Sequence, residues 1–528
     1  MKNPLLLVTV LCAILGSSSN LVQGQEIKLK AKISEAAYND DVLLPKVQLV
    51  TTENSLVVLS SNEGEGNATA LQYRLELYGT DKLELMRTIE PVRKAPAGVA
   101  AIETALMFGG RSILIGSQRR PAENLIKLYW QQFDPRLARN NAPFLDLVSL
   151  DLAPASAGSA LTGDGAAPLG FQVTPSPDGS KMLLAAGDLP LANGRTLHVF
   201  LVVDKDMQVL WQQVVVSNGE MKSSHLHSAV VDNKGTCTAW LGNTMLQEPT
   251  KEGVGNVATK VYRMSSEGVV EADFKMRDNY WPASARLLVL DSGAVACSGV
   301  FGSKMEKKDY TPGTFLALLA KGEYEFKQMA TTKFPSRGQA GEKPYENMRT
   351  ANFLLGPKGS TFLVCEVGDL QDAVVTSTFG RNTNVTERIH GDIVAQSFSA
   401  VGASNWMTVI PRNTKSISHL LGKTQSLVYD GRLNIFTLDD EATIAQRLKG
   451  ERSAVAVATE GTRTLHHAFD TRGGYISRST LSSGKDVDFM IGDQPLQASP
   501  DSFYITAQRK LGKGKVVPVK LEFSLGTK

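Results

Sequence analysis

Two histidines, His225 and His227, lie two residues apart in the segment SHLHS and could together bind a metal ion. On a β-strand, a spacing of two residues places both imidazoles on one face, as is common among zinc ligands. The sequence offers no identifiable third ligand for them. The pair is therefore a weak metal candidate, and we predict neither a metal site nor a cofactor.

Aromatic side chains are better candidates for ligand binding. Tyr280 and Trp281 lie in the predicted loop RDNYWPA, where flat rings could stack on a sugar or anchor a peptide. The alternative is a structural role, in which the rings fill space between neighbouring units of the fold. Arg381 and Glu387, in the longest predicted loop, could add polar contacts on the same side. These four are the predicted ligand-binding residues.

Motifs for catalysis are absent from the sequence. It contains no G-x-S-x-G nucleophile elbow, no P-loop and no G-x-G-x-x-G ahead of a helix. Asp204 and Asp206 do not match the spacing of a calcium-binding loop. Paired carboxylates for glycoside chemistry would come from distant segments and leave no local pattern. We therefore predict no catalytic residue and expect a protein that is not an enzyme.

Charge and the N-terminal segment bear on partners and location. The 56 basic and 53 acidic residues leave a net charge of +3, which argues against a nucleic-acid surface. Residues 1–24 have the form of a signal peptide, with a basic start, an apolar run over residues 5–15, and small residues at Val22 and Gly24. No later segment reaches the roughly 18 apolar residues of a membrane span. We expect an exported protein, periplasmic or extracellular.

The candidate residues must be positioned by a repeated unit of short strands. Four segments share a tight turn and an apolar strand that ends in glycine: PDGSKMLLAAGD, DNKGTCTAWLGN, DSGAVACSGVFGS and PKGSTFLVCEVGD. Their closing glycines, Gly187, Gly242, Gly302 and Gly368, are 55, 60 and 66 residues apart. A period of this size built from short strands is typical of a β-propeller, in which each four-stranded sheet forms one blade.

A second hairpin follows the first in each unit, and its turn carries Gly268, Gly322 or Gly402, with Met207 at that position in one copy. We predict an all-β propeller, residues 25–528, of eight blades, with seven as the alternative. The last unit lacks a strand, and residues 26–36 supply a spare one that would close the ring. The predicted blades are 40–95, 100–152, 168–217, 225–277, 282–334, 347–413, 415–482 and 487–528.

Three cysteines follow residue 24, namely Cys237, Cys297 and Cys365, and no CxxC pair is present. They fall at corresponding positions in three predicted blades. We expect buried thiols that pack as small apolar side chains. A disulfide between adjacent blades is the alternative.

Loop length distinguishes two faces of the predicted propeller. Turns within hairpins are short, whereas links between second and third strands and between blades are long and polar, as in residues 369–390. Both kinds of long link emerge on one side of an up-and-down blade, here called the long-loop face; the other side is the short-turn face. Because binding residues are often carried on loops held by a rigid frame, we predict that the long-loop face binds the ligand.

The segment VTPSPDGSKMLLAAGD resembles the repeat of TolB-type and WD-repeat propellers, and GDIVAQSFSAVGASNWMTVIPRN is similar to blades of secreted bacterial propeller proteins. The resemblance covers residues 40–528 and implies a propeller in an envelope or extracellular setting. It implies no catalytic residue, because propellers host many functions.

We therefore expect a monomeric binding or scaffold protein that recognises a glycan, a peptide or an envelope protein. A glycoside hydrolase or lyase is the alternative, and a quinoprotein dehydrogenase is a weaker one.

Overall fold

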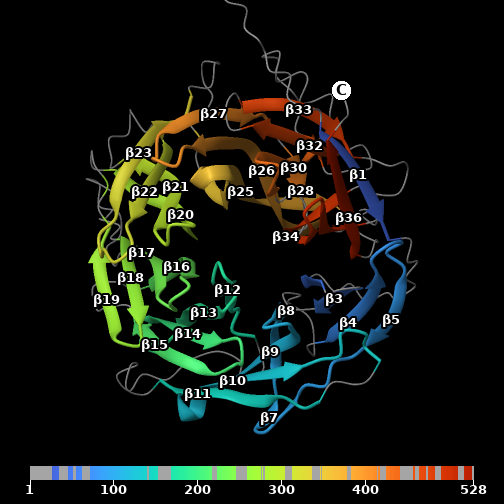
Figure 1. Ribbon diagram of the computed structural model, residues 1–528, viewed down its shortest axis with the longest axis vertical. Coiled ribbons are helices and arrows are strands. Elements are labelled where there is room, and N and C mark those ends of the chain that lie inside the picture. The colour runs from blue at the N-terminus through green and yellow to red at the C-terminus, as the bar shows by residue number, and fades with distance from the viewer. Residues whose placement is uncertain are drawn as a thin grey trace, which may run out of the picture.

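Eight antiparallel sheets stand around a common axis, as Figure 1 shows. The prediction of an all-β propeller with eight blades is confirmed, and seven blades are excluded. The computed structural model describes residues 27–34, 46–51, 55–61, 72–138, 142–152, 168–216, 223–244, 259–274, 276, 280–303, 312–335, 345, 348–376, 382–412, 414–416, 424–439, 456–457, 463–470, 474–481, 489–508 and 516–525.

Within each blade the first strand lies nearest the axis and the fourth lies at the rim (Figure 1). The strands of blades 1 to 4 are β2 (Lys46–Thr51), β3 (Ser55–Ser61), β4 (Tyr73–Gly79) and β5 (Leu85–Ile89); β8 (Ala101–Phe108), β9 (Arg111–Arg120), β10 (Leu125–Gln132) and β11 (Leu145–Asp151); β12 (Gln172–Pro175), β13 (Lys181–Pro190), β14 (Thr196–Asp204) and β15 (Val209–Val216); β16 (Ser223–Val231), β17 (Cys237–Thr244), β18 (Thr259–Ser265) and β19 (Gly268–Asp273).

Blades 5 to 8 follow the same order, and blade 6 carries two additional short strands, β28 and β31. Their strands are β20 (Tyr280–Val289), β21 (Val295–Ser303), β22 (Gly313–Leu319) and β23 (Lys327–Lys333); β24 (Met348–Leu355), β25 (Thr361–Thr376), β26 (Asn382–Phe398), β27 (Ser404–Ile410), β28 (Thr414–Ser416) and β31 (Ala456–Val457); β29 (Gln425–Tyr429), β30 (Arg432–Asp439), β32 (Arg463–Asp470) and β33 (Gly474–Thr480); β34 (Phe489–Ser499), β35 (Ser502–Gln508), β36 (Val516–Leu525) and β1 (Ile27–Ile33).

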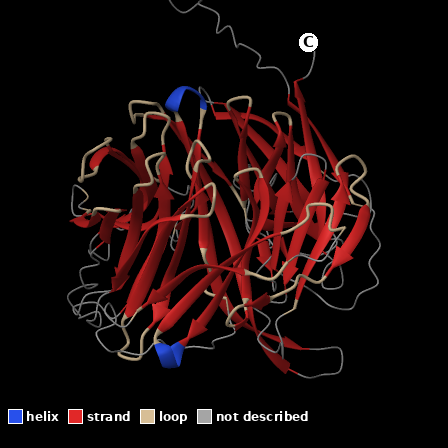
Figure 2. Cartoon of the chain, turned by 60° about the horizontal axis from the view of Figure 1, so that its bottom comes forward, coloured by secondary structure: helices blue, strands red, loops and turns tan. Residues whose placement is uncertain are grey.

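Helical structure in the described chain consists of single 3-10 turns at Pro121–Glu123 and Pro357–Gly359, which stand out against the strands in Figure 2. A two-stranded hairpin of β6 (Lys94–Ala95) and β7 (Gly98–Val99) lies between blades 1 and 2 in the chain. No helix among the described residues has the length and apolar character needed to cross a membrane.

The N-terminal strand closes the ring, as predicted. Strand β1 pairs antiparallel with β36 from Ile27 opposite Leu525 to Ile33 opposite Val519. Ile27 also packs in an apolar cluster with Leu427 of blade 7 and Phe523 of blade 8. The first and last parts of the chain therefore share one sheet, and the pairing covers a strand edge that would otherwise be open.

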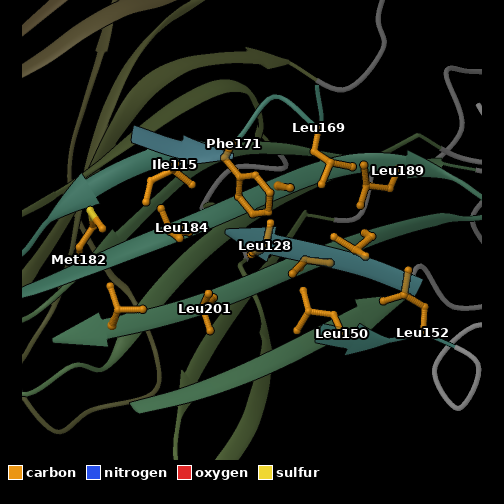
Figure 3. Packing of buried hydrophobic residues seen from close by; sticks show 14 of the residues in the cluster. Ile115, Leu128, Leu150, Leu152, Leu169, Phe171, Met182, Leu184, Leu189 and Leu201 are labelled. Atoms are coloured by element: carbon orange, nitrogen blue, oxygen red, sulfur yellow. The ribbon is translucent and has the colours of Figure 1, made fainter. Parts of the chain in front are cut away.

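Apolar clusters fill the seams between neighbouring blades. Figure 3 shows the seam between blades 2 and 3, where Ile115 and Leu128 meet Met182 and Leu184. Inner strands of a blade are covered on both faces, and β14 is accordingly buried from Thr196 to Val203. Cys237, Cys297 and Cys365 are free, buried members of three of these clusters, which confirms their predicted packing role.

Side-chain hydrogen bonds also join the inner strands of neighbouring blades. The backbone N–H of Leu287 in blade 5 donates to Ser228 Oγ in blade 4 over 3.1 Å, and that of Thr350 in blade 6 donates to Ser284 Oγ in blade 5 over 3.0 Å. Asn352 Nδ2 in blade 6 donates to Ser426 Oγ in β29, the inner strand of blade 7, over 2.8 Å. These bonds hold the inner strands in a fixed register around the axis.

Two local features bear on the sequence predictions. Met207, which stands where other blades have a turn glycine, adopts a φ of 62°, in the left-handed region that Gly322 and Gly402 also occupy.

Residues 369–390, predicted as a loop, instead extend β25 and β26 into a long hairpin whose pairs run from Gly368 opposite His390 to Thr376 opposite Asn382. That loop prediction is wrong, because β-branched residues on both sides of the turn allow the two strands to continue pairing.

Candidate functional site on the long-loop face

The inner strands of four blades share a β-bulge near their long-loop ends. Register shifts leave Glu103, His227, Ala283 and Ala351 without an opposite residue on the second strand. A bulge bends a strand and changes the direction of nearby side chains, and bulges are common beside functional sites. The bulge therefore gives a common reference point for comparing the blades.

Two residues before the bulge, blades 4, 5 and 6 carry His225, Trp281 and Arg349. The three inner strands β16, β20 and β24 are successive neighbours around the axis, with β16 contacting β20 and β20 contacting β24. His225, Trp281 and Arg349 thus occupy equivalent positions on three adjacent inner strands, near their long-loop ends. We refer to these three residues as the His225–Trp281–Arg349 arc.

His225 is supported by a carboxylate from the preceding blade. Its side chain is 56% exposed, and its Nδ1 lies 3.1 Å from Oδ2 of Asp188, which is 45% exposed. The backbone N–H of Leu226 donates to the other carboxylate oxygen of Asp188 over 3.0 Å. When Nδ1–H donates to a carboxylate, Nε2 becomes the basic nitrogen of the ring.

Asp188 itself has an unusual backbone conformation. It follows the closing Gly187, lies in the irregular stretch of β13, and has a φ of 60°. Non-glycine residues in the left-handed region are uncommon and cluster at functional sites. The strained conformation carries the Asp188 carboxylate across the seam to blade 4.

The buried residues His198 and Ser224, next to the Asp188–His225 pair, form with Asp188 a set of the residue types found in a catalytic triad. The protons are in the wrong positions for that role. Nε2 of His198 lies 2.6 Å from Ser224 Oγ, while the backbone N–H of Asp188 donates to His198 Nδ1 over 3.3 Å. Because Nδ1 accepts a hydrogen bond, the proton is on Nε2 and points to Ser224, so this imidazole cannot take the Ser224 proton. Burial lowers the pKa of His198 to about 4, and Ser224 is 1% exposed. This group is structural.

Arg349 is held by a carboxylate that is almost fully buried. Glu366 Oε1 accepts hydrogen bonds from Arg349 Nε and Nη2 over 3.1 and 2.7 Å. Glu366 Oε2 accepts from Arg412 Nη2 over 3.1 Å and from the Thr424 hydroxyl over 2.7 Å. Burial opposes ionisation of Glu366, but Arg412, Arg349 and Thr424 outweigh it and lower its pKa to about 2.

In this second group, two guanidinium groups contact one buried carboxylate, that of Glu366. The backbone N–H of Arg412 also donates to Asp392 Oδ1 over 3.1 Å. Arg412 is 2% exposed, whereas the Arg349 side chain is 42% exposed. Arg349 is therefore the guanidinium of this group that reaches solvent.

Three of the four predicted ligand-binding residues lie in strands, and the fourth lies outside the described residues. Tyr280 and Trp281 begin the inner strand β20, opposite Ser303 and Gly302, and do not lie in a loop as predicted. The pairing with β21 extends further toward the long-loop face than the turn-like sequence RDNYWPA indicates. Glu387 lies in β26 opposite Gln371, and Arg381 lies outside the described residues.

His225 and His227 do not act as a simple pair on one strand face. The bulge at His227 interrupts the alternation of side chains, so His225 is exposed while His227 packs over Gly242. Burial is the main cause that lowers the pKa of His227. Within the described ranges, no group of three or more His, Cys, Asp or Glu side chains is arranged to hold a metal ion.

Sequence reasoning missed Asp188, Arg349 and Glu366. One signal was available, because an Asp or Asn follows the closing glycine in three of the four copies, at Asp188, Asn243 and Asp369. Another was Glu366, a charged residue inside the apolar strand TFLVCEVG. The sequence did not reveal their partners, which lie in other strands.

Comparison with known proteins gives information about the fold only. No protein-family model matches the chain, and no curated protein matches it. Among solved structures, the β-propeller domain of the trilobed protease from Pyrococcus furiosus is 8% identical, covers 84% of this chain and 97% of its own, and has a TM-score of 0.34. An ulvan lyase, described as a polysaccharide lyase bound to a saccharide, is 10% identical and covers 63% of this chain and 78% of its own, with a TM-score of 0.35. A prolyl oligopeptidase from Galerina marginata is 9% identical and covers 94% of this chain and 56% of its own, with a TM-score of 0.37.

These comparisons correct one prediction. The sequence analysis expected a protein that is not an enzyme, yet the similar solved structures include a polysaccharide lyase and a prolyl oligopeptidase. The fold is thus shared with enzymes, and catalysis is not excluded by it. At these identities the likeness shows the fold alone, and the TolB-type resemblance of the repeat remains a prediction.

Proposed function

We propose that this protein binds an acidic carbohydrate around the ring axis on its long-loop face, through the His225–Trp281–Arg349 arc. The observation that carries the proposal is the Arg349 guanidinium, which Glu366 holds in place and which is 42% exposed to solvent. A fixed guanidinium is well suited to a carboxylate or sulfate because it can donate two parallel hydrogen bonds. An export signal in residues 1–24 would bring the protein to extracellular or envelope glycans.

The neighbours of Arg349 in the arc suit a sugar ring. An indole at position 281 would provide a flat apolar surface for stacking. His225 and Asp188 would exchange hydrogen bonds with sugar hydroxyls, since one is a donor or acceptor and the other a strong acceptor. Charge, stacking and hydroxyl recognition would then come from three adjacent blades.

The test is a calorimetric titration of residues 25–528 with oligogalacturonate and with a neutral cello-oligosaccharide of equal length. We expect saturable binding of the acidic oligosaccharide and at least tenfold weaker binding of the neutral one. Trp281→Ala and Arg349→Met are each expected to weaken acidic binding about tenfold, which corresponds to the loss of one stacking or charged contact.

The matched control is Tyr324→Ala. Tyr324 is also an exposed aromatic residue, 57% exposed, but it lies in a hairpin turn on the short-turn face. Its removal should leave the affinity unchanged. Equal affinity for acidic and neutral oligosaccharides, or an equal loss in all three variants, would contradict the proposal.

A second candidate function is cleavage of the bound acidic chain by β-elimination. It is favoured by the Asp188–His225 contact, which leaves Nε2 of an exposed imidazole as a base. That nitrogen would remove the proton next to the uronate carboxylate, the bond to the leaving sugar oxygen would break, and a carbon–carbon double bond would form. The leaving oxygen would take a proton from water.

Cleavage is tested by the ultraviolet absorbance of the unsaturated product. We expect His225→Gln to abolish that product while changing oligosaccharide affinity only a few-fold. Binding without any product from the unmodified protein would exclude this second candidate and leave the binding function intact.

A further inference from the structure

A groove lies on the opposite side of the molecule from the arc. It has a volume of about 940 Å³ and opens on the short-turn face at the seam between blades 1 and 2. Its lining includes three arginines, Arg87, Arg111 and Arg136, and two methionines, Met86 and Met107. A volume of this size is in the range of small-molecule sites.

Two of the arginines are fixed by neutral backbone groups. Arg87 Nη1 donates to the carbonyl of Leu137 over 2.8 Å. Arg111 donates to the carbonyl of Lys205, and its guanidinium lies 5.6 Å from the centre of the Trp130 ring. Carbonyls orient a guanidinium without cancelling its charge, so both positive charges remain available to a ligand.

Among the residues that the structure describes, the lining of the groove includes no Asp or Glu. Arg111 Nη2 forms an ion pair with Asp206 Oδ1 over 3.8 Å, and the Asp206 side chain is 66% exposed, where solvent and salt screen it. The described lining of the groove therefore carries three arginines and no acidic side chain, in a chain whose overall charge is nearly balanced.

A strained turn at Leu137 supports Arg87. Leu137 is buried and has a φ of 49°, an unfavourable conformation for a bulky residue. Asp134 holds the turn, because its carboxylate accepts the backbone N–H groups of Arg136 and Ala138 over 2.9 and 3.0 Å. The same strained residue supplies the carbonyl that orients Arg87. Strain of this kind is frequently maintained at binding sites.

Apolar surface lies beside the charges. Met86 is 60% exposed and Met107 is 38% exposed, and both line the groove. Methionine side chains are flexible and polarisable, and they adapt to apolar ligands of varied shape. The groove thus combines fixed cations with an adaptable apolar wall.

From this arrangement we propose that the groove binds an amphipathic anion, a molecule in which a phosphate, sulfate or carboxylate group is joined to an apolar chain. The guanidinium groups of Arg87 and Arg111 bind the anionic group, and Arg136 adds a third positive charge at the exposed rim. Met86 and Met107 cover the apolar chain. This site is separate from the arc on the long-loop face and does not depend on it.

Calorimetric titration with octyl phosphate tests the proposal, with inorganic phosphate and octyl glucoside as partial ligands. We expect octyl phosphate to bind at one site per chain and at least tenfold more tightly than either partial ligand. Affinity should fall as salt concentration rises, because the contact is charged. No saturable binding, or equal binding of octyl glucoside, would overturn the proposal.

Arg111→Met has a closely matched control in Arg263→Met. Arg263 also donates to a backbone carbonyl of a neighbouring blade, that of Glu323, and its guanidinium lies 5.3 Å from the Tyr324 ring centre, but it is outside the groove. We expect Arg111→Met to weaken octyl phosphate binding about tenfold and Arg263→Met to leave it unchanged. Met86→Glu, at an exposed position, should abolish binding by repulsion without affecting folding. An equal effect of both arginine variants would contradict the assignment.

The source of the anion is distinguished by a second measurement. Co-sedimentation with vesicles of phosphatidylglycerol that is lost in Met86→Glu would assign the site to a lipid headgroup in a membrane. Octyl phosphate binding without co-sedimentation would assign it to a free amphiphile.

Discussion

The two ends of the His225–Trp281–Arg349 arc are built on the same plan and differ in the depth of the supporting carboxylate. His225 and Arg349 occupy equivalent positions before the bulge, and each contacts a carboxylate from a second strand. Asp188 is 45% exposed, whereas Glu366 has a side-chain exposure of 5%. One end of the arc therefore rests on a solvated carboxylate and the other on a buried one.

The difference in burial between Glu366 and Asp188 gives the two carboxylates different roles. Glu366 must compensate Arg412, which is 2% exposed, so its negative charge is committed to the seam between blades 6 and 7. Asp188 faces no buried cation, because the adjacent His198 is kept neutral by burial. The comparison indicates that Glu366 is a structural residue and that Asp188 is available for a ligand.

The largest expected effect comes from removing the buried carboxylate. Glu366→Ala removes the carboxylate that pairs with the buried Arg412, and we expect a loss of about 3–5 kcal/mol of unfolding free energy. Asp188→Ala should cost about 1 kcal/mol, mainly through the hydrogen bond from the Leu226 N–H. Urea unfolding measures both. Similar losses in the two variants would remove the distinction between the two ends.

Acid should affect the two seams in different pH ranges. His198 has its folded pKa lowered from 6.5 to about 4, so the unfolded state binds a proton first and stability falls as pH drops from about 6.5 to 4. Glu366 has its folded pKa lowered from 4.5 to about 2, so its contribution is lost only as pH falls below about 4.5. Each shift corresponds to about 3 kcal/mol.

Urea midpoints measured from pH 7 to pH 3 test this order. His198→Gln should flatten the decline between pH 6.5 and 4 and leave the lower part of the curve in place. His466 has a similar buried environment, with a pKa lowered to about 4, and its decline should therefore persist in His198→Gln. A curve that is unchanged in the upper range would show that His198 is not the group responsible.

A smaller effect is expected at the exposed end of the charged group. Arg349→Met removes two hydrogen bonds to Glu366 but leaves Arg412 and Thr424 in contact with it. We expect a loss of about 1–2 kcal/mol, less than for Glu366→Ala, as a charged hydrogen bond at a half-exposed side chain would give. Unfolding in urea checks this. A loss as large as that of Glu366→Ala would mean that Arg349 is structural.

The smallest effect concerns the strained backbone at Asp188. Glycine adopts a φ of 60° without steric cost, so Asp188→Gly should be more stable than Asp188→Ala by roughly 1 kcal/mol. Thermal unfolding of the two variants measures the difference. Equal stability would show that the left-handed conformation is not retained once the carboxylate is removed.

The number of blades, the order of their strands and the closing N-terminal strand could be predicted from the sequence alone. These features depend on local patterns, since alternating apolar residues and turn glycines recur within each unit. Burial of Cys237, Cys297 and Cys365 followed from the same alternation. The signal peptide at residues 1–24 lies outside the described residues, and export and the monomeric state remain predictions.

The residues that meet at the site could be identified only from the folded chain. Asp188 and His225 are separated by 37 residues, and Glu366 and Arg412 by 46 residues. Each of these contacts depends on how two strands pair or how two blades pack, and a one-residue bulge decides which side chains reach the surface. For that reason the sequence identified His225 and Trp281 as candidates, whereas the carboxylates and the third member of the arc, Arg349, emerged only from the folded chain.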